Sequence, residues 1–350
     1  MNTPGSLPSE GLAAGLGEHG LIDLIRSRLS PAPPDLIVGP GDDAAIVRPD
    51  RGALQILTTD ALVEGVHFDL RFSSPADVGH KALAVNLSDV AAMGGVPRFA
   101  LLSLMLPAAC TRANVEGLLD GLIGLAERSK VAIAGGNITR SPGPLVVDVT
   151  LTGSARPRRF LTRDAGRAGD RLYVSGAIGA AAVGLAWFQA QAAAGRGVLE
   201  PPADPGLAEC LERHRRPEPR TRLGLLLGRM RAASACMDLS DGLADAVRQV
   251  AAASGTGALV DAARLPIHPA AARWFASHGI DPVQRALGAG DDYELLFAVS
   301  AKVKGRFRAA ARLARGLPLT HIGELTSEPG VRLVTEDGVE SELPPGFVHF

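Results

Sequence analysis

The amino-acid sequence predicts an α/β protein with two domains. The chain has 350 residues, of which 46% are hydrophobic, and this is enough to bury more than one sizeable core. Apolar runs of strand length alternate with runs of helical periodicity along most of the chain, as is typical of α/β proteins. We place the domains at residues 18–155 and 156–350, preceded by a flexible Gly-, Pro- and Ser-rich terminus at 1–17.

The N-terminal half is expected to alternate between helices and strands. Ser74 is a suitable N-cap for a helix that begins at Pro75 and stops at Gly94-Gly95. Apolar residues recur at helical spacing between 115 and 129. The expected helices are 20–29, 75–93 and 115–129, and the expected strands are 54–59, which delivers Asp60 at its end, 99–106, 131–134 and 145–153.

The C-terminal half follows a basic connection at 154–170 and repeats this alternation. Glu336-Asp337-Gly338 lies between two apolar runs and indicates a β-hairpin. The expected helices are 179–194, 207–213, 223–231, 243–253 and 302–315, and the expected strands are 171–175, 235–237, 293–299, 319–324, 331–335 and 339–343.

The composition argues against several classes of protein. The 36 Lys and Arg residues nearly balance the 37 Asp and Glu residues, so no basic surface for nucleic acid is expected. Three cysteines without metal-ligand spacing fit a reducing compartment. No signal peptide is recognisable, and no apolar stretch reaches the roughly 18–20 residues needed to span a bilayer. We therefore expect a cytoplasmic protein that binds neither nucleic acid nor membrane.

Six short polar motifs are the most informative feature of the chain. Gathered carboxylates repel one another unless a cation compensates, and Mg²⁺ takes oxygen ligands that it usually shares with substrate phosphates. The set therefore predicts chemistry on phosphate, although neither a Walker A motif nor a protein-kinase HRD or DFG motif is present. The motifs are Gly-Asp-Asp at 41–43, Thr-Thr-Asp at 58–60, Asn-Leu-Ser-Asp at 86–89, Gly-Gly-Asn at 135–137, Asp-Leu-Ser-Asp-Gly at 238–242 and Gly-Asp-Asp-Tyr-Glu at 290–294.

Most of these motifs also have a purely structural explanation. Asp, Asn and Gly favour turns, so the motifs at 41–43, 58–60 and 135–137 can be ordinary turn or cap residues. Ser240 or Asp241 can be the N-cap of the helix that follows. The functional alternatives are that paired glycines let the backbone approach a phosphate and that a helix N-terminus favours an anion.

Three further residues are candidates for a role in the site. Asp89 lies on the apolar face of its expected helix with Asn86 one turn earlier, so it either binds a metal or pairs with Lys81 or an arginine. His67 follows the Thr-Thr-Asp motif and is either a structural histidine or part of the same site. Arg163 can grip a phosphate with both guanidinium arms, or it can be a solvated residue of a basic linker.

Taken in order and spacing, the motifs resemble those of the thiamine-monophosphate kinase family, within the aminoimidazole-ribonucleotide-synthetase superfamily. The resemblance runs from about residue 20 to the C-terminus. The stretches that carry it are GPGDDAAIV (39–47), LTTDALVEGVHF (57–68), HKALAVNLSDVAAMGGVP (80–97), AGGNITR (134–140), LTRDAGRAGD (161–170), HRRPEPR (214–220), MDLSDGLADAV (237–247), GDDYELLF (290–297) and GFVHF (346–350).

The resemblance implies ATP-dependent phosphorylation of thiamine monophosphate to thiamine diphosphate. Transfer is expected to be direct and in line, assisted by several Mg²⁺ ions and without a covalent catalytic nucleophile. The implied fold has two α/β domains: the N-terminal domain holds ATP and pairs in a homodimer, and the C-terminal domain closes over the substrates.

The same resemblance implies three sets of site residues. The implied metal ligands are Asp43, Thr58, Thr59, Asp60, Asp89, Asn137, Asp238 and Asp241. The implied ATP contacts are Gly136, Asn137, Arg163 and Ser240, and the implied thiamine-phosphate contacts are His67, Asp291 and Phe347. Two of these depart from the family pattern, which has Asp at the position of Asn137 and Glu at the position of Asp291.

Two other functions stay open on the sequence. The chain can be another ATP-using enzyme of the superfamily, although its first cysteine is Cys110, which argues against selenophosphate synthesis through an N-terminal nucleophile. It can also be a nucleotide or thiamine-phosphate binding protein without activity, because of the departures at Asn137 and Asp291.

Overall fold

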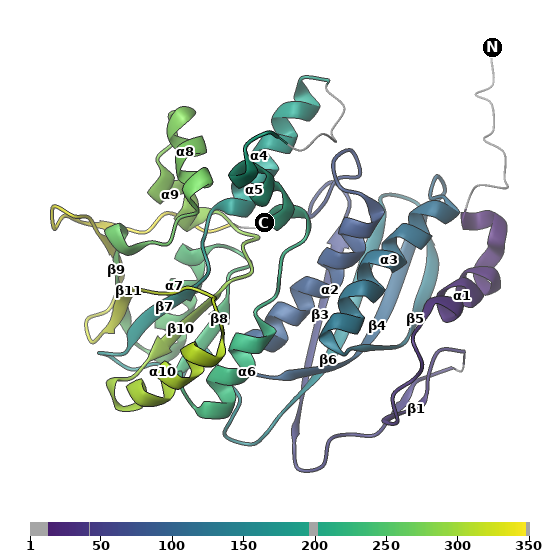
Figure 1. The fold of residues 1–350 in the computed structure, drawn as a ribbon, viewed down its shortest axis with the longest axis horizontal. Helices are drawn as coiled ribbons and strands as arrows, with labels where there is room; N and C mark the ends of the chain where they lie inside the picture. The colour runs from purple at the N-terminus through teal and green to yellow at the C-terminus, as the bar shows by residue number, and fades with distance from the viewer. Residues whose placement is uncertain (1–12, 42, 196–201, 348–350) are drawn as a thin grey trace. The chain divides into compact units, whose positions relative to one another are not determined.

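Two larger sheets and a short two-stranded ribbon organise the described part of the chain. The computed structural model describes residues 13–41, 43–195 and 202–347 (Figure 1). Most of the terminus expected to be flexible, residues 1–12, therefore lies outside the described residues, while Ala13–Leu16 form a 3-10 helix. The chain divides into two compact units, which consist of residues 1–51, 57–86 and 97–153, and of residues 52–56, 87–96 and 154–350.

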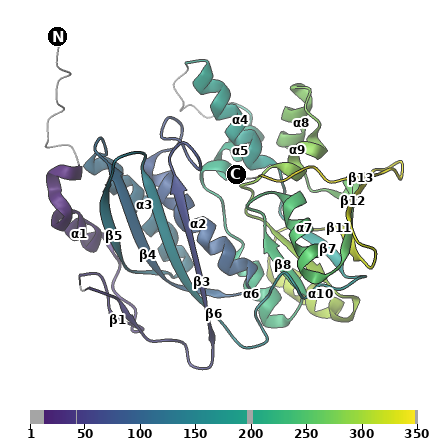
Figure 2. The same ribbon diagram turned by 180° about the vertical axis from the view of Figure 1, so that it is seen from behind.

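Unit 1 is built around a four-stranded sheet with the strand order β3-β6-β4-β5. Strands β4 and β5 run parallel. Helices α2 and α3 cover one face of the sheet, and Figure 2 shows the opposite face in front of them. The elements are α1 (Gly17–Arg28), β1 (Leu36–Val38), β2 (Ile46–Val47), β3 (Leu54–Val63), α2 (Pro75–Ala92), β4 (Val96–Pro107), α3 (Arg112–Ser129), β5 (Ala132–Ser141) and β6 (Val146–Ala155).

The beginning of α2 and its contact with α3 follow from local sequence. The Ser74 hydroxyl accepts a hydrogen bond from the Asp77 amide (3.2 Å), and the Asp77 carboxylate accepts one from the Ser74 amide (2.9 Å). This reciprocal cap confirms the expected start of the helix. Two glycines let the helices touch, because a Cβ at Gly79 would lie 1.9 Å from a carbonyl oxygen of α3, and one at Gly121 would lie 1.8 Å from a carbonyl oxygen of α2.

The two faces of the unit 1 sheet differ in character. Along β6, Val147, Val149 and Leu151 are fully buried on the face that the helices cover, while the alternate residues are only half-buried. We call the opposite side the open face. It exposes apolar side chains, since Leu57 is 68% and Leu101 is 41% exposed.

Unit 2 contains a seven-stranded sheet with the order β13-β12-β9-β11-β7-β10-β8. Neighbouring strands are antiparallel, except for β12 and β9, which are parallel. The elements are β7 (Arg171–Ser175), α4 (Ala180–Ala193), α5 (Pro205–Arg215), α6 (Thr221–Met230), β8 (Ala235–Asp238), α7 (Leu243–Ser254), β9 (Gly257–Asp261), α8 (Pro269–Ser277), α9 (Pro282–Gly288), β10 (Leu295–Val299), α10 (Lys304–Leu313), β11 (Leu319–Thr326), β12 (Val331–Val334) and β13 (Glu340–Glu342).

This sheet is covered by helices on both faces. Every residue of β10 is buried, and its side chains alternate between two cores. Leu296 packs on the side of α7, whereas Leu295 and Phe297 pack on the side of α6 and α10. A strand that is buried on both faces needs a continuous apolar sequence, and Leu-Leu-Phe-Ala-Val provides one.

Most of the expected elements are present, and the mixed helix and sheet class is confirmed. The strand at 171–175 and the hairpin of β12 and β13 lie where the sequence predicts them. Two expectations are wrong: β3 does not end before Asp60 but continues to Val63, and β5 does not end at residue 134 but continues to Ser141. The sequence patterns also predict no element for residues 257–288, where β9, α8 and α9 lie.

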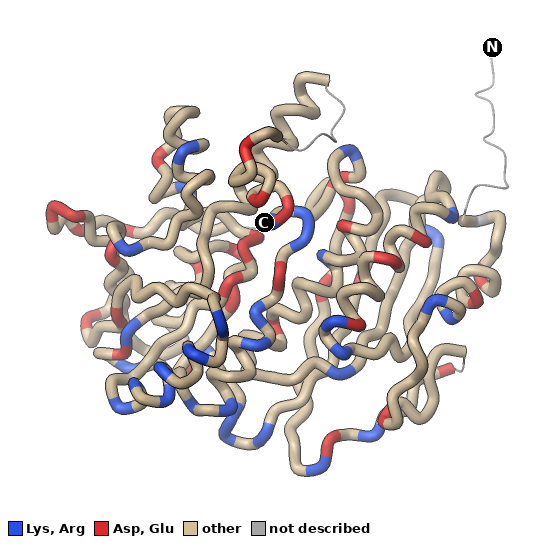
Figure 3. The backbone as a smooth tube through the Cα atoms, viewed as in Figure 1, with Lys and Arg blue, Asp and Glu red and all other residues tan. Residues whose placement is uncertain are grey.

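Charged side chains are distributed over both units. Acidic and basic residues are interspersed along the backbone in Figure 3, and their numbers in the sequence nearly balance, with a net charge of −1. None of the helices in the described part of the chain combines the length and hydropathy needed to cross a membrane.

Candidate active site

The Thr-Thr-Asp motif lies in the middle of a strand. Side chains alternate along β3, so Thr58 and Asp60 point to the helix-covered face and Thr59 points to the open face. The Thr59 hydroxyl lies 2.9 Å from Thr150 Oγ1 and 3.1 Å from Asp148 Oδ1 of the neighbouring strand β6. Thr58 and Asp60 can therefore offer side chains to one ion, but the Thr59 side chain points the other way.

His67 is held in a defined tautomer at the end of the following loop. Its Nδ1 accepts a hydrogen bond from the Val63 amide at 3.1 Å, so a neutral ring carries its proton on Nε2. The carbonyl oxygen of His67 accepts a hydrogen bond from Lys81 Nζ, also at 3.1 Å. The half-buried ring thus presents a hydrogen-bond donor at Nε2.

The Gly-Gly-Asn motif belongs to β5, so the explanation as a tight turn is wrong. Gly136 is paired with Leu102 of β4, and a Cβ at Gly136 would lie 1.8 Å from the Leu102 carbonyl oxygen. The glycine is required by the contact between the strands. Asn137 follows in the same strand and is exposed.

Asp43 lies on an exposed loop between β1 and β2. The preceding Gly41 has a φ of +118°, and a Cβ there would lie 2.9 Å from the Arg26 guanidinium carbon. Only glycine fits this backbone without displacing Arg26. The loop is therefore placed next to a cation of α1.

Asn86 has a buried oxygen that supports the prediction of a cation site. Its side chain is fully buried, and its Nδ2 donates to the carbonyl oxygen of Ala82 (3.1 Å). Its Oδ1 has no hydrogen-bond partner. A buried acceptor without a donor is costly, and a hard cation satisfies such an oxygen. The described residues nevertheless contain no group of three His, Cys, Asp or Glu side chains already gathered around one point.

In unit 2, to which residues 87–96 belong, Asp238 is held by the end of α2. It is the last residue of β8 and is 3% exposed. Its Oδ2 accepts a hydrogen bond from the Ser88 hydroxyl at 2.8 Å. Asp89, the next residue of α2, is half-buried.

Backbone hydrogen bonds join three segments that are distant in sequence. The Asp291 amide donates to the Ser240 carbonyl oxygen (2.8 Å), and the Phe347 amide donates to the Asp241 carbonyl oxygen (3.1 Å). Gly290 is needed for this contact, because a Cβ there would lie 2.3 Å from the Ser240 oxygen. Four predicted site residues, Ser240, Asp241, Asp291 and Phe347, are therefore neighbours.

The helix after this loop has no side-chain cap from Ser240 or Asp241. The N-cap of α7 is Gly242, whose φ of 99° is accessible mainly to glycine, and it makes no side-chain cap. The structural explanation for the two preceding polar residues is therefore wrong. Arg163 lies in the connection before β7 and contacts α7 farther along the helix, where its exposed guanidinium donates to Gln249 Oε1 at 2.5 Å.

The Asp291 loop has an unusual backbone. Asp291 and Tyr293 have φ angles of 69° and 47°, which residues with a Cβ rarely adopt. The Tyr293 hydroxyl donates to Asp291 Oδ1 at 3.2 Å, and His214 Nδ1 lies 3.8 Å from Asp291 Oδ2. Sequence reasoning did not single out Tyr293, His214 or Ser88 for the site, although each lies inside a stretch that carries the family resemblance.

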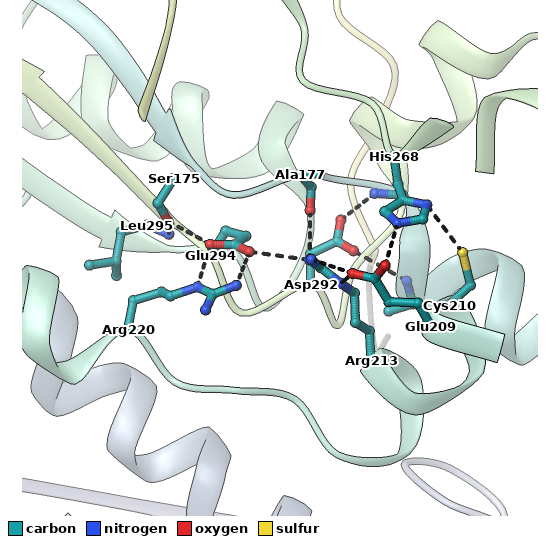
Figure 4. Close-up of polar contacts among 12 residues, drawn as sticks. Ser175, Ala177, Glu209, Cys210, Arg213, Arg220, His268, Asp292, Glu294 and Leu295 are labelled. Atoms are coloured by element: carbon teal, nitrogen blue, oxygen red, sulfur yellow. Dashed lines mark hydrogen bonds and ion pairs between the residues drawn. The ribbon is translucent and has the colours of Figure 1, made fainter. Parts of the chain in front are cut away.

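Cys210 has neighbours that look like those of a catalytic thiol. Its Sγ lies 3.5 Å from His268 Nδ1, and His268 Nε2 lies 3.3 Å from a Glu209 oxygen (Figure 4). However, Cys210 is fully buried, and this burial raises the pKa of its thiol to about 12, with a further increase from the charge of Glu209. The thiol therefore stays protonated and is not a nucleophile.

Most of the chain matches two known domain families. Residues 41–155 match the family described as AIR synthase related protein, N-terminal domain, and residues 167–336 match its C-terminal domain. The chain is therefore an AIR synthase related protein with both domains in their usual order.

The comparison also defines the family within this class. The chain is 33% identical over 315 residues to the thiamine-monophosphate kinase of Bacillus subtilis, covering 89% of this chain and 93% of the relative. It resembles the crystal structure of thiamine-monophosphate kinase from Stenotrophomonas maltophilia (TM-score 0.80, 38% identity, 93% and 98% covered). It also resembles AaThiL complexed with AMPPCP and TMP (TM-score 0.74, 34% identity, both chains fully covered). The chain belongs to the thiamine-monophosphate kinase family, so the family prediction is confirmed.

Proposed function

We propose that the chain is a kinase that transfers the terminal phosphate of ATP to thiamine monophosphate and forms thiamine diphosphate. The observation that carries this proposal is the junction of Ser240, Asp241, Asp291 and Phe347 through backbone hydrogen bonds in a chain of this family. Further support comes from the similar structure of AaThiL, which holds AMPPCP and TMP.

The acceptor would be held by His67, Asp291 and Phe347. The Nε2 donor of His67 suits a phosphate oxygen, the Asp291 carboxylate suits an amino group, and the exposed Phe347 ring suits stacking on a heteroaromatic ring. The attacking group is a phosphate that is already ionised at neutral pH. No strong general base would therefore be required.

The nucleotide would be held by Gly136, Asn137, Arg163 and Ser240. Gly136 allows the close contact of β5 with β4, and the exposed side chain of Asn137 beside it can reach a ligand. The Arg163 guanidinium is exposed and would exchange Gln249 for phosphate oxygens, to which arginine binds with two parallel hydrogen bonds. These residues would orient ATP for transfer in line with the acceptor.

Magnesium would be bound by oxygen ligands. We propose Asp43, Thr58, Thr59, Asp60, Asp89, Asn137, Asp238 and Asp241, with Thr59 acting through its main-chain carbonyl because its side chain points to the open face. The unsatisfied Oδ1 of Asn86 adds an oxygen of the correct chemistry. Bound Mg²⁺ would neutralise the charge of the phosphate groups.

We also propose a homodimer formed through the open face of unit 1, and a cytoplasmic location. The exposed Leu57 and Leu101 on a sheet surface support the dimer, because apolar side chains on an uncovered sheet favour a protein partner. Cys110, Cys210 and Cys236 are all free thiols, as expected in a reducing compartment.

The assay that tests the function measures both products in one reaction. With ATP, Mg²⁺ and thiamine monophosphate, we expect ADP and thiamine diphosphate in equal amounts. Turnover of an aminoimidazole precursor instead would assign the chain to another reaction of its superfamily. Tight binding of both substrates without any turnover would identify a non-catalytic binding protein.

A further inference from the structure

Glu294 is a fully buried carboxylate with three cationic or hydroxyl partners (Figure 4). Its Oε2 accepts hydrogen bonds from Ser175 Oγ and Arg220 Nε, both at 2.6 Å. Its Oε1 accepts from the second arm of Arg220 and, at 3.4 Å, from Arg213 Nη1. The two-armed pairing compensates for the cost of burying the charge.

The surrounding backbone is adapted to this carboxylate. A Cβ at Gly176 would lie 2.0 Å from Glu294 Oε1, so only glycine leaves room for it. Ser175 Oγ also accepts a hydrogen bond from the Leu295 amide at 2.9 Å. Although burial lowers the pKa of the Arg220 guanidinium, the hydrogen bonds and charge of Glu294 raise it overall. Arg220 therefore stays charged within the pair.

The partners of Glu294 come from a segment far from it in sequence. Arg220 is the N-cap residue of α6, and Arg213 lies in the last turn of α5. The segment that contains them also contains His214, whose Nδ1 lies 3.8 Å from an Asp291 oxygen. The ion pair thus fixes two segments to each other, of which one contains Asp291 and the other approaches Asp291 through His214.

A second anchor lies two residues before Glu294. The Asp292 carboxylate accepts hydrogen bonds from the Gly179 amide (2.7 Å) and the Ala181 amide (3.3 Å) at the beginning of α4. Residues 292 and 294 are thus fixed through their side chains, whereas residues 291 and 293 have the left-handed backbone. A left-handed residue with a Cβ costs about 1 kcal/mol or more, so the loop needs such anchors.

We propose that Arg220 and Glu294 are positioning residues that hold the Asp291 carboxylate in its substrate-binding orientation. This inference rests on the proposed function, in which Asp291 binds the acceptor. Burying an ion pair contributes little net stability in general, so stability alone is a poor explanation for this one. Its geometric effect is to fix the backbone immediately after the residue that contacts the substrate.

The test compares Glu294→Gln with the matched control Arg222→Gln. Arg222 lies in the first turn of α6, whose N-cap residue is Arg220, but the Arg222 guanidinium donates to the Leu313 carbonyl oxygen and not to Glu294. In Glu294→Gln we expect the KM for thiamine monophosphate to rise about 10-fold or more, with kcat and the KM for ATP nearly unchanged. Arg220→Lys, which keeps the charge but loses the two-armed geometry, should give a smaller rise in the same constant.

Hydrogen exchange provides a second measurement that does not depend on catalysis. The Asp291 and Tyr293 amides donate to carbonyl oxygens of residues 240 and 239, and they should exchange faster in Glu294→Gln and in Arg220→Lys than in Arg222→Gln. Unchanged exchange of these amides would overturn the proposal. Faster exchange with an unchanged KM for thiamine monophosphate would also overturn it.

The two measurements separate this proposal from the proposed function. Lack of turnover by the wild-type protein would contradict the kinase assignment, while the exchange rates would still decide whether Glu294 positions Asp291. If Glu294→Gln fails to fold, Arg220→Lys is compared with Arg222→Gln in both measurements and decides the proposal by the same outcomes.

Discussion

The Ser88 hydroxyl donates a hydrogen bond of 2.8 Å to the buried carboxylate of Asp238, although 150 residues separate the two in sequence. A serine on one turn of α2 thereby supports an acidic residue at the end of β8. This hydrogen bond fixes the orientation of the Asp238 carboxylate, and a carboxylate that is held in this way suits a metal ligand.

Ser88→Ala is expected to weaken magnesium use. Loss of the hydroxyl leaves the Asp238 carboxylate with one donor fewer, so its position becomes less defined and the free energy of unfolding should fall by about 1 kcal/mol. Activity should then require a higher Mg²⁺ concentration for saturation, as measured by magnesium titration. Ser27→Ala, which removes an exposed hydroxyl bond within α1, is the control. Identical titration curves for both variants would contradict a role of Ser88.

Asp60→Ala is expected to abolish turnover and leave the fold intact. Asp60 points to the helix-covered face of β3 with Thr58, and we propose that it binds Mg²⁺. The metal-free protein is not destabilised by this change, because removal of one carboxylate from a set of like charges relieves their repulsion. The control is Thr150→Val on the open face, which should retain activity. Near-normal kcat of Asp60→Ala at saturating Mg²⁺ would remove this residue from the metal site.

Asn137→Asp is expected to strengthen magnesium binding. Asn137 is exposed on β5, so a carboxylate is accommodated there, and a charged ligand binds Mg²⁺ more tightly than a neutral amide. Activity should saturate at a lower Mg²⁺ concentration, with the KM for thiamine monophosphate nearly unchanged. If the titration curves of the two proteins superimpose, residue 137 does not contribute to the metal or nucleotide site.

Asp292 is expected to make stability depend on pH. Burial raises the pKa of its carboxyl from 3.8 to about 7, against the opposing effect of the Gly179 and Ala181 amides. The folded protein therefore binds more protons than the unfolded chain between about pH 4 and 7. The free energy of unfolding falls as pH rises across this range. The free energy of unfolding, compared with Asp292→Asn, should fall by roughly 2–3 kcal/mol from pH 5 to pH 8. If the free energy of unfolding of the wild type rises with pH relative to that of Asp292→Asn, the folded protein prefers the ionised Asp292 carboxylate and the prediction is wrong.

Leu57→Arg is expected to produce monomers. A charged residue on the open face would have to be desolvated in the dimer, at a cost that exceeds the loss of one apolar contact. Light scattering at several protein concentrations measures the change in mass. The control is Val339→Arg, because Val339 is 60% exposed but lies in the hairpin of unit 2. Equal masses for both variants and the wild type would contradict pairing through the open face.

Local sequence was sufficient to predict most helices and strands. Ser74 and Pro75 locate the start of α2, and the alternating or continuous apolar runs locate β7 and β10, because capping and burial leave short-range patterns. Residues 257–288 were missed because β9, Gly-Ala-Leu-Val-Asp, has only a short run of large apolar side chains and the helices that follow are short. Such elements acquire their stability from packing and leave a weak periodic signal.

The ordered set of acidic motifs was sufficient to indicate the family and its chemistry on phosphate. Whether a side chain can offer an oxygen atom to Mg²⁺ depends on the residue type, which the sequence states directly. The orientation of those residues depended on tertiary structure. Pairing with β4 turns the Gly-Gly-Asn motif into strand, and alternation along β3 separates Thr59 from Asp60. The neighbourhood of Ser240, Asp291 and Phe347, and the burial of Glu294 between Arg213 and Arg220, depend on contacts between segments tens to more than a hundred residues apart. No local pattern encodes such contacts, because they form only when the sheet brings its loops together.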